Sequence, residues 1–205
     1  MKFLTLLLGV MVVCAIQLLA TEKNHYDSDF FFGTVYLKNG KVIHGEIKHE
    51  LNPAIIVLKR QNITQAFTPQ LVNYFQYVDE ENDKIKTFIS LYKETKDSGY
   101  FRRIFFEVLV PGQLNLLKTS KRIINPESNK SMRYKKSREK YVFLHKYFIL
   151  SNKKLLNIKD FEKEMKSVLG EDLFAVQEFI KEKDLNLNGE TAYIQVLNYY
   201  NQISN

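Results

Sequence analysis

Residues 31–48 constrain the fold most, because they predict two strands joined by a tight turn at Asn39-Gly40. Asn-Gly between β-rich runs favours a type I′ hairpin turn, in which both central residues need positive φ. Such a turn fixes a register in which Tyr36 faces Ile43, Phe32 faces Ile47, Leu37 faces Val42 and Val35 faces His44. Both faces of this hairpin carry apolar side chains, so we expect it to lie inside a sheet or a small barrel.

Runs typical of strands continue along the chain, and from residue 161 the apolar period changes from two to 3.6. Phe161, Met165 and Leu169 then share one helical face, and two further amphipathic segments follow. The strand-like runs are 54–58, 63–67, 71–78, 85–92, 114–117, 141–150 and 155–158, with 104–110 open to either strand or helix. This order predicts an α+β fold: an N-terminal antiparallel β-sheet or small β-barrel-like unit built on hairpins (31–158), followed by two to three C-terminal amphipathic helices (159–205).

The first twenty residues are typical of a secretory signal peptide. Lys2 precedes an uncharged apolar run that ends near Ala20, and a polar stretch begins at Thr21. We therefore expect residues 1–20 to be removed, 21–30 to form a flexible lead-in, and the protein to be periplasmic, outer-membrane-associated or secreted. The alternative is an uncleaved membrane anchor, since the run is close to the ~17 residues that can span a bilayer. Cys14, the single cysteine, lies in this run, so a mature chain would have no disulfide or thiol chemistry.

Residues 118–140 hold nine basic and two acidic residues, which together equal the whole net charge of +7. Asn125-Pro126 and several serines in this segment predict a long loop rather than a packed element. Like-charge runs are commonly solvated, which is the plainest interpretation. The functional alternative is electrostatic attachment to an anionic partner, either an envelope component such as lipid or lipopolysaccharide, or another protein. The candidate binding residues are Lys121, Arg122, Arg133, Lys135, Lys136, Arg138 and Lys140.

The sharpest metal motif is Asp184-x-Asn186-x-Asn188-Gly189-Glu190, which has the spacing of an EF-hand calcium loop between two amphipathic helices. Its twelfth position is Gln195, so the bidentate glutamate that sets calcium affinity is missing. Asn188 also suits the N-cap of the last helix. A weak calcium-responsive module stays open as an alternative, while we predict no metal site and no cofactor.

The other polar groups do not assemble into a recognised catalytic motif. His44 and Glu46 alternate on one strand, with His49 and Glu50 beyond, but a metal site would need a third fixed ligand. The sequence lacks a nucleophile elbow, an HExxH motif, a phosphate-cradling glycine loop and a CxxC pair. An enzyme, for instance a hydrolase, would have to assemble its site from residues far apart in the sequence, so we predict no catalytic residues.

Several short motifs resemble a family of exported proteins from Bacteroidetes bacteria that has no established activity. They are the signal peptide, Gly33-x-Val35-x-Leu37-Lys38-Asn39-Gly40, Phe67-x-Pro69-x-x-Val72, Phe106-Glu107-Val108-Leu109-Val110-x-Gly112 with Leu116-Leu117, and Tyr200-Asn201. The resemblance covers most of the mature chain and lapses in the basic segment. It implies an exported, envelope-associated protein of a Gram-negative bacterium, and it implies no catalytic residue.

The spacing from Leu37 to Ile47 is also similar to that of an Sm-like RNA-binding barrel. Where that family places its Asp and Asn, this chain has Leu51 and Ile55, which removes the polar groups for reading bases. We therefore disfavour nucleic acid as a partner. The function predicted from sequence is a non-enzymatic binding or scaffold protein of the cell envelope, with an enzyme or a weak calcium-responsive module as alternatives.

Overall fold

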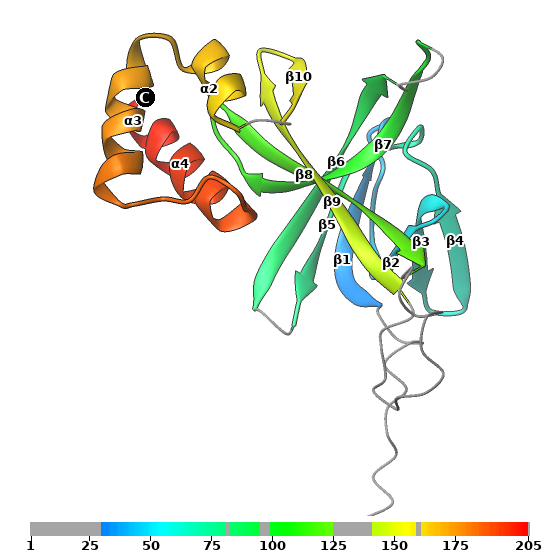
Figure 1. Ribbon diagram of the computed structural model, residues 1–205. Helices are drawn as coiled ribbons and strands as arrows, with labels where there is room; N and C mark the ends of the chain where they lie inside the picture. Colours follow the sequence, from blue (N-terminus) through cyan, green and yellow to red (C-terminus); the bar gives the residue numbers. More distant parts are fainter. Residues whose placement is uncertain (1–29, 81–82, 95–98, 125–140, 159–160, 205) are drawn as a thin grey trace, which may run out of the picture.

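The computed structural model describes residues 30–80, 83–94, 99–124, 141–158 and 161–204. Within these residues ten strands pair into one open antiparallel sheet, in the order β10-β9-β8-β7-β6-β5-β1-β2-β3-β4 (Figure 1). The strands are β1 (Phe31–Leu37), β2 (Val42–Leu51), β3 (Ala54–Arg60), β4 (Ile63–Phe67), β5 (Val72–Asp79), β6 (Lys84–Glu94), β7 (Phe101–Val110), β8 (Asn115–Ile124), β9 (Tyr141–Ser151) and β10 (Lys154–Asn157). They are followed by α2 (Phe161–Leu169), the 3-10 helix η1 (Gly170–Asp172), α3 (Leu173–Glu182) and α4 (Glu190–Ile203).

The predicted fold class is wrong, because the hairpins do not form a small N-terminal unit with helices added behind it. Strand β5 pairs with β1 on one side and with β6 on the other, so the first hairpins continue edge to edge into the later ones. The result is a single open sheet of ten strands. The pairing of β1 with β5 joins residues far apart in sequence, and no local turn signal specifies it.

The register predicted for the first hairpin is also wrong, by one residue. Val35 lies opposite Ile43 rather than His44. Leu37 N donates to Lys41 O at 2.9 Å and Gly40 N donates to Leu37 O at 3.1 Å, which leaves three residues in the loop. Within this fully described turn only Gly40, with a φ of 85°, adopts a positive φ, whereas a type I′ turn needs two such residues. The additional loop residue places Val35 and Ile43 together in the core.

The basic segment is partly strand, which corrects the prediction of a loop over 118–140. Lys118, Lys121 and Arg122 belong to β8, which pairs with β9 from Asn115 to Ile124. Charged side chains do not prevent a strand here, because β9 satisfies the backbone hydrogen bonds on one side of β8 and the long Lys and Arg side chains extend away from the backbone. Residues 125–140 lie outside the described part of the chain, as do the predicted signal peptide and most of the lead-in.

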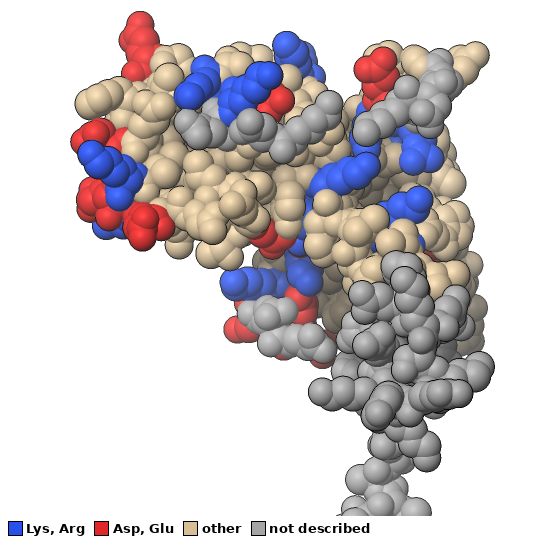
Figure 2. Space-filling model, in the orientation of Figure 1, with Lys and Arg blue, Asp and Glu red and all other residues tan. Residues whose placement is uncertain are grey.

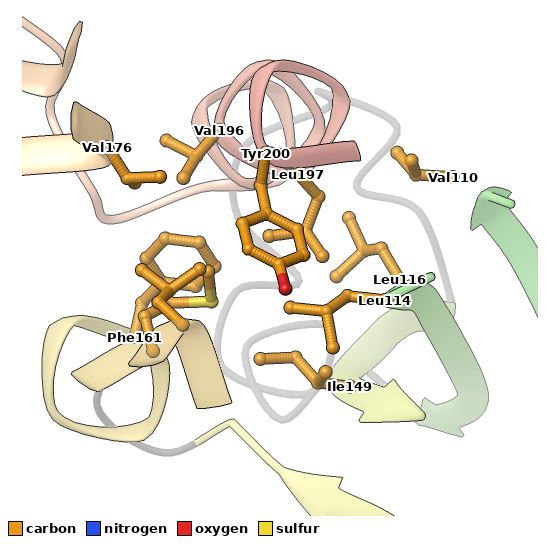
Figure 3. Packing of buried hydrophobic residues seen from close by; sticks show 11 residues of the cluster. Val110, Leu114, Leu116, Ile149, Phe161, Val176, Val196, Leu197 and Tyr200 are labelled. Carbon is orange, nitrogen blue, oxygen red and sulfur yellow. The ribbon is translucent and has the colours of Figure 1, made fainter. Parts of the chain in front are cut away.

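Two apolar clusters lie on the same face of the sheet, at its opposite ends. Toward the N-terminus, Val35, Phe75 and Phe88 pair across β1, β5 and β6 in a cluster that also includes residues of β2 and β3. Toward the C-terminus the helices supply the cover, and they gather beside β8–β10 in Figure 1. In Figure 3 the ring of Tyr200 from α4 points between the side chains at the sheet, which include Leu114. Among the described residues no helix is long and apolar enough to cross a membrane.

Candidate functional site

The sheet forks between β7 and β8. These two strands pair only where residues 107–110 meet 116–118, with an irregularity between Val108 and Val110. Beyond that point residues 101–106 of β7 remain paired with β6, and residues 119–124 of β8 remain paired with β9. The β6–β7 hairpin and the β8–β9 ribbon therefore diverge as two arms, which cross near their junction in Figure 1. We call the space between the two arms the fork.

A cleft of about 1040 Å³ occupies the fork. Residues of both arms line it, and the β2–β3 turn and the β9–β10 turn close its ends. At one end Asn52 Nδ2 donates a hydrogen bond of 3.2 Å to the backbone carbonyl of Arg122, which ties the β2–β3 turn to β8. At the other end Lys153 and Leu155 belong to the lining. The cleft is thus built by the splaying of a continuous sheet.

Lys and Arg side chains are concentrated on one face of the arms, which we call the cationic face. Cross-strand pairing places Lys93 beside Arg102 on one arm, and Lys146 beside Thr119 on the other. Because residues two apart on a strand share a face, Lys121 lies on this face as well. In Figure 2 Lys and Arg side chains are visible in the hollow between the region of β10 and the β6–β7 hairpin.

The opposite face of the fork is aromatic. Phe88, Phe101 and Phe105 lie there, and all three line the cleft. Phe101 is 66% exposed, whereas Phe105 is buried in the N-terminal cluster. The two carboxylates of the lining, Glu94 and Glu107, belong to this aromatic face rather than to the cationic one. The lining carboxylates and the cations Lys93, Arg102, Lys121 and Lys146 therefore lie on opposite faces of the fork. The cationic face also contains one aromatic ring, that of Phe148, whose centroid lies 5.0 Å from Lys93 Nζ.

His49 closes the aromatic face from β2, where its partly buried ring packs against aromatic side chains and does not form the polar or metal-binding group that its spacing suggested. Its ring centroid lies 4.8 Å from that of Phe88 and 5.6 Å from that of Phe105, both in edge-to-face geometry. Burial lowers the pKa of His49 from 6.5 to about 4, against a small opposing effect of Glu50. The imidazole is accordingly neutral at pH 7 and adds no charge to the cleft.

Lys118 lies at the junction of the fork, where its charge is already neutralised. Its Nζ is 3.0 Å from Glu107 Oε2 and 3.2 Å from Glu190 Oε2, and its side chain is only 13% exposed. Tyr147 OH donates to the same Glu190 oxygen at 3.0 Å. Burial, followed by this hydrogen bond, raises the pKa of Tyr147 to about 12. The cluster joins β7, β8 and β9 to the first turn of α4.

The contacts of Glu190 also concern the predicted alternative of a calcium-responsive module, because Glu190 belongs to the EF-hand-like motif. Glu190 is one of the two charged residues of the EF-hand-like motif, and its carboxylate is directed to the sheet, where an ammonium group binds it. The N-cap of α4 is Gly189 rather than Asn188, with no side-chain capping bond. Among the described residues no three His, Cys, Asp or Glu side chains converge as metal ligands. Near His44, for example, the neighbour at 3.0 Å is the hydroxyl of Thr34.

Two of the seven basic residues predicted to bind an anionic partner are described, and of these two Lys121 lines the cleft. Arg122 projects to the other side of β8, where its guanidinium lies 4.9 Å from the ring centroid of Tyr141. Arg133, Lys135, Lys136, Arg138 and Lys140 fall outside the described residues. Sequence reasoning missed Lys93, Arg102, Lys146 and Lys153, because they belong to separate segments of the sequence and only the fold brings them to one cleft.

A second pair of cations, Lys38 and Arg103, has a structural role. Lys38 Nζ donates to the carbonyls of Pro69 at 3.3 Å and Gln70 at 2.7 Å, and Arg103 donates to the carbonyl of Ser90 at 2.8 Å. Burial and the nearby Arg103 lower the pKa of Lys38. Lys38 thus ties the β1–β2 turn to the turn before β5, Arg103 ties β7 to β6, and Ser90 Oγ of β6 donates to the Pro69 carbonyl at 2.6 Å. This pair is therefore a weaker candidate for binding a ligand than the cationic face.

The comparisons with known proteins give little further guidance. No protein-family model matches the chain, and no solved structure matches it. Guanylate cyclase beta of Plasmodium berghei (strain Anka) is 33% identical to this chain over 84 residues, which is 38% of this chain and 3% of that protein. The chain spans only this small fraction of its relative's length, and the match shows neither a family nor an activity.

Proposed function

We propose that the protein is a non-enzymatic binding protein that holds an anionic partner in the fork. The observation that carries the proposal is the segregation of charge. Arg102, Lys121 and Lys146 lie together with Lys93 on the cationic face, and the lining carboxylates lie on the other. Clefts lined by one sign of charge concentrate ligands of the opposite sign and accelerate their association.

The enzyme alternative has one observation in its favour. Ser120 lines the cleft, and its Oγ lies 2.8 Å from His145 Nδ1. These two residues are direct cross-strand partners, and Thr34 and His44 make the same contact at 3.0 Å in the other half of the sheet. A hydroxyl–imidazole contact is therefore a general consequence of pairing in this sheet. A fluorophosphonate probe that labels the protein but not its Ser120→Ala variant would instead establish a hydrolase.

The same proposal includes export. The features that support it are the apolar run before Ala20 and the resemblance to exported Bacteroidetes proteins. In that setting the partner is an anionic component of the envelope or another protein, and the protein is periplasmic, outer-membrane-associated or secreted. N-terminal sequencing of the protein from fractionated cells should find Thr21 first, and Met1 on the exported protein would contradict this.

The binding proposal is tested by removing charge from the cationic face. The double variant Lys121→Gln/Lys146→Gln should bind fluorescein-labelled polyglutamate about tenfold more weakly at low salt, because each exposed ion pair contributes up to about 1 kcal/mol. The matched control is Lys41→Gln/Lys84→Gln, which removes the same charge from exposed residues outside the cleft. Equal affinity of the two double variants for polyglutamate and for phosphatidylglycerol vesicles would refute the proposal.

A further inference from the structure

We propose that the partner is an extended acidic polypeptide segment that adds to the sheet as a strand inside the fork. This inference rests on the proposed function and specifies its ligand. It predicts a segment in which acidic and apolar side chains alternate. Three observations support it: the unpaired backbone edges of the fork, the chemistry of its two lining faces, and the positive charge of the rest of the chain.

The first observation is that β7 and β8 each have an unpaired backbone edge at the fork. An antiparallel strand directs its N–H and C=O groups to its two neighbours in alternation. Residues 101–106 of β7 and 119–121 of β8 are paired on one side, while their other sides face the cleft. Such edges are the surfaces to which extended peptides add as extra strands. The hydrogen bond from Asn52 to the Arg122 carbonyl marks where the β2–β3 turn closes this space.

The two lining faces select the side chains of the added strand. Successive residues of a strand point to opposite faces of the sheet. A strand in the fork would therefore direct one set of side chains toward Arg102, Lys121 and Lys146, and the other set toward Phe101 and Phe105. Carboxylates complement the first set, and apolar side chains complement the second. A small anion or a lipid headgroup would use the cations but leave the edges and the aromatic face without a complement.

The charge of the chain itself disfavours an occupant from the same protein. Segment 125–140, which follows β8, has six basic and two acidic residues. A second copy of the chain would bring a net charge of +7 to a cationic surface. Like charges repel in both cases, so we assign the fork to an acidic segment of a different polypeptide.

The test uses three fluorescein-labelled ten-residue peptides with five Glu and five Val. One alternates the two residues, one groups them in blocks, and one alternates them with N-methyl groups on every second backbone nitrogen. The alternating peptide should bind about tenfold more tightly than the other two, because they lose backbone hydrogen bonds or the matching of faces. It should also slow amide hydrogen exchange at residues 101–106 and 119–121.

Two variants separate the contributions of the faces. Lys121→Gln/Lys146→Gln should weaken all three peptides. Phe101→Ser changes an exposed side chain, so the fold is preserved, and it should weaken only the alternating peptide.

The inference is overturned, with the proposed function intact, if the N-methylated and unmodified alternating peptides bind equally and the Lys double variant weakens both. Binding to phosphatidylglycerol vesicles without binding to any peptide would assign the cleft to a membrane surface. If neither peptides nor vesicles bind, the proposed function fails and this inference fails with it.

Discussion

The two ends of the sheet bury the same face in different ways. In the N-terminal part the strands cover one another, with the ring of His49 from β2 packed against Phe75 of β5 and Phe105 of β7. In the C-terminal part the strands remain uncovered by other strands, and α2, α3 and α4 supply the apolar side chains instead. The difference shows that a single sheet can be completed either by its own curvature or by helices that pack against it.

The fork lies where these two arrangements meet. Backbone pairing between β7 and β8 is limited to residues 107–110 of β7 and 116–118 of β8, close to the helices. The helices cover β8 and β9 at the junction, around Leu116 and Ile149. Residues 119–124 of β8 contribute no side chain to that cluster, and Asn52 of the β2–β3 turn binds the Arg122 carbonyl there. The comparison therefore predicts that the contacts near Lys118 and Asn201, which join the helices to this junction, have large effects on stability.

The largest effect is expected for Lys118→Met. Removing the ammonium group leaves Glu107 and Glu190 facing one another without a cation, and loss of one partner of a buried ion pair typically costs about 3–5 kcal/mol. Urea unfolding followed by circular dichroism should show this loss in the free energy of unfolding. The matched control is Lys59→Met, whose ion pair with Glu46 spans 3.9 Å between exposed side chains and should contribute less than about 1 kcal/mol. Equal losses in both variants would contradict a special role of the junction.

The second prediction concerns pH and the N-terminal part. Because the pKa of His49 is about 4 in the folded protein and 6.5 ordinarily, the unfolded state binds a proton more readily between these values. This group should therefore reduce stability as pH falls from 6.5 to 4, by a total of about 3 kcal/mol, and contribute no further change outside that window.

The His49→Phe variant tests this assignment, since an apolar ring suits the surrounding aromatic side chains. The free energy of unfolding should depend less on pH between 6.5 and 4 in the variant than in the wild type. At pH 7 and above, the difference between the two proteins should not change with pH. An unaltered pH dependence in His49→Phe would show that the pKa of His49 is the same in the folded and unfolded states.

Local patterns in the sequence predicted elements better than their assembly. The hairpin at Asn39-Gly40 and the 3.6-residue period after Phe161 are local signals, and both segments adopt the expected type of element. The register of the hairpin differs because a three-residue loop and a two-residue loop both suit Asn-Gly. The cationic face could not be predicted from the sequence, because it depends on the cross-strand pairing of Lys93 with Arg102 and of Thr119 with Lys146. No local sequence pattern encodes this pairing. The burial of His49 likewise depends on strands that are distant in sequence.

The resemblance motifs contained one tertiary contact that spacing alone did not indicate. Asn201, from the motif at the end of the chain, hydrogen-bonds to the turn that contains Gly112. A Cβ at Gly112 would overlap the Asn201 amide, which explains why a glycine suits this position. Two motifs 89 positions apart by number therefore form one contact between α4 and the β7–β8 turn.

The smallest of the three effects is expected for Asn201→Ala, which tests that contact. Asn201 Oδ1 accepts from Leu114 N at 3.0 Å, and its Nδ2 donates to the carbonyls of Leu114 at 3.0 Å and Pro111 at 3.3 Å. Truncation leaves a partly buried N–H and C=O without this partner, which should lower the free energy of unfolding by about 2 kcal/mol. Asn198→Ala, at an exposed position in the same helix, is the matched control and should have almost no effect. Faster amide hydrogen exchange at Leu114 in Asn201→Ala, without a change at β1 and β2, would show that the helices hold the junction independently of the N-terminal part. Equal acceleration in both parts would instead show that the two ends of the sheet unfold as one cooperative unit.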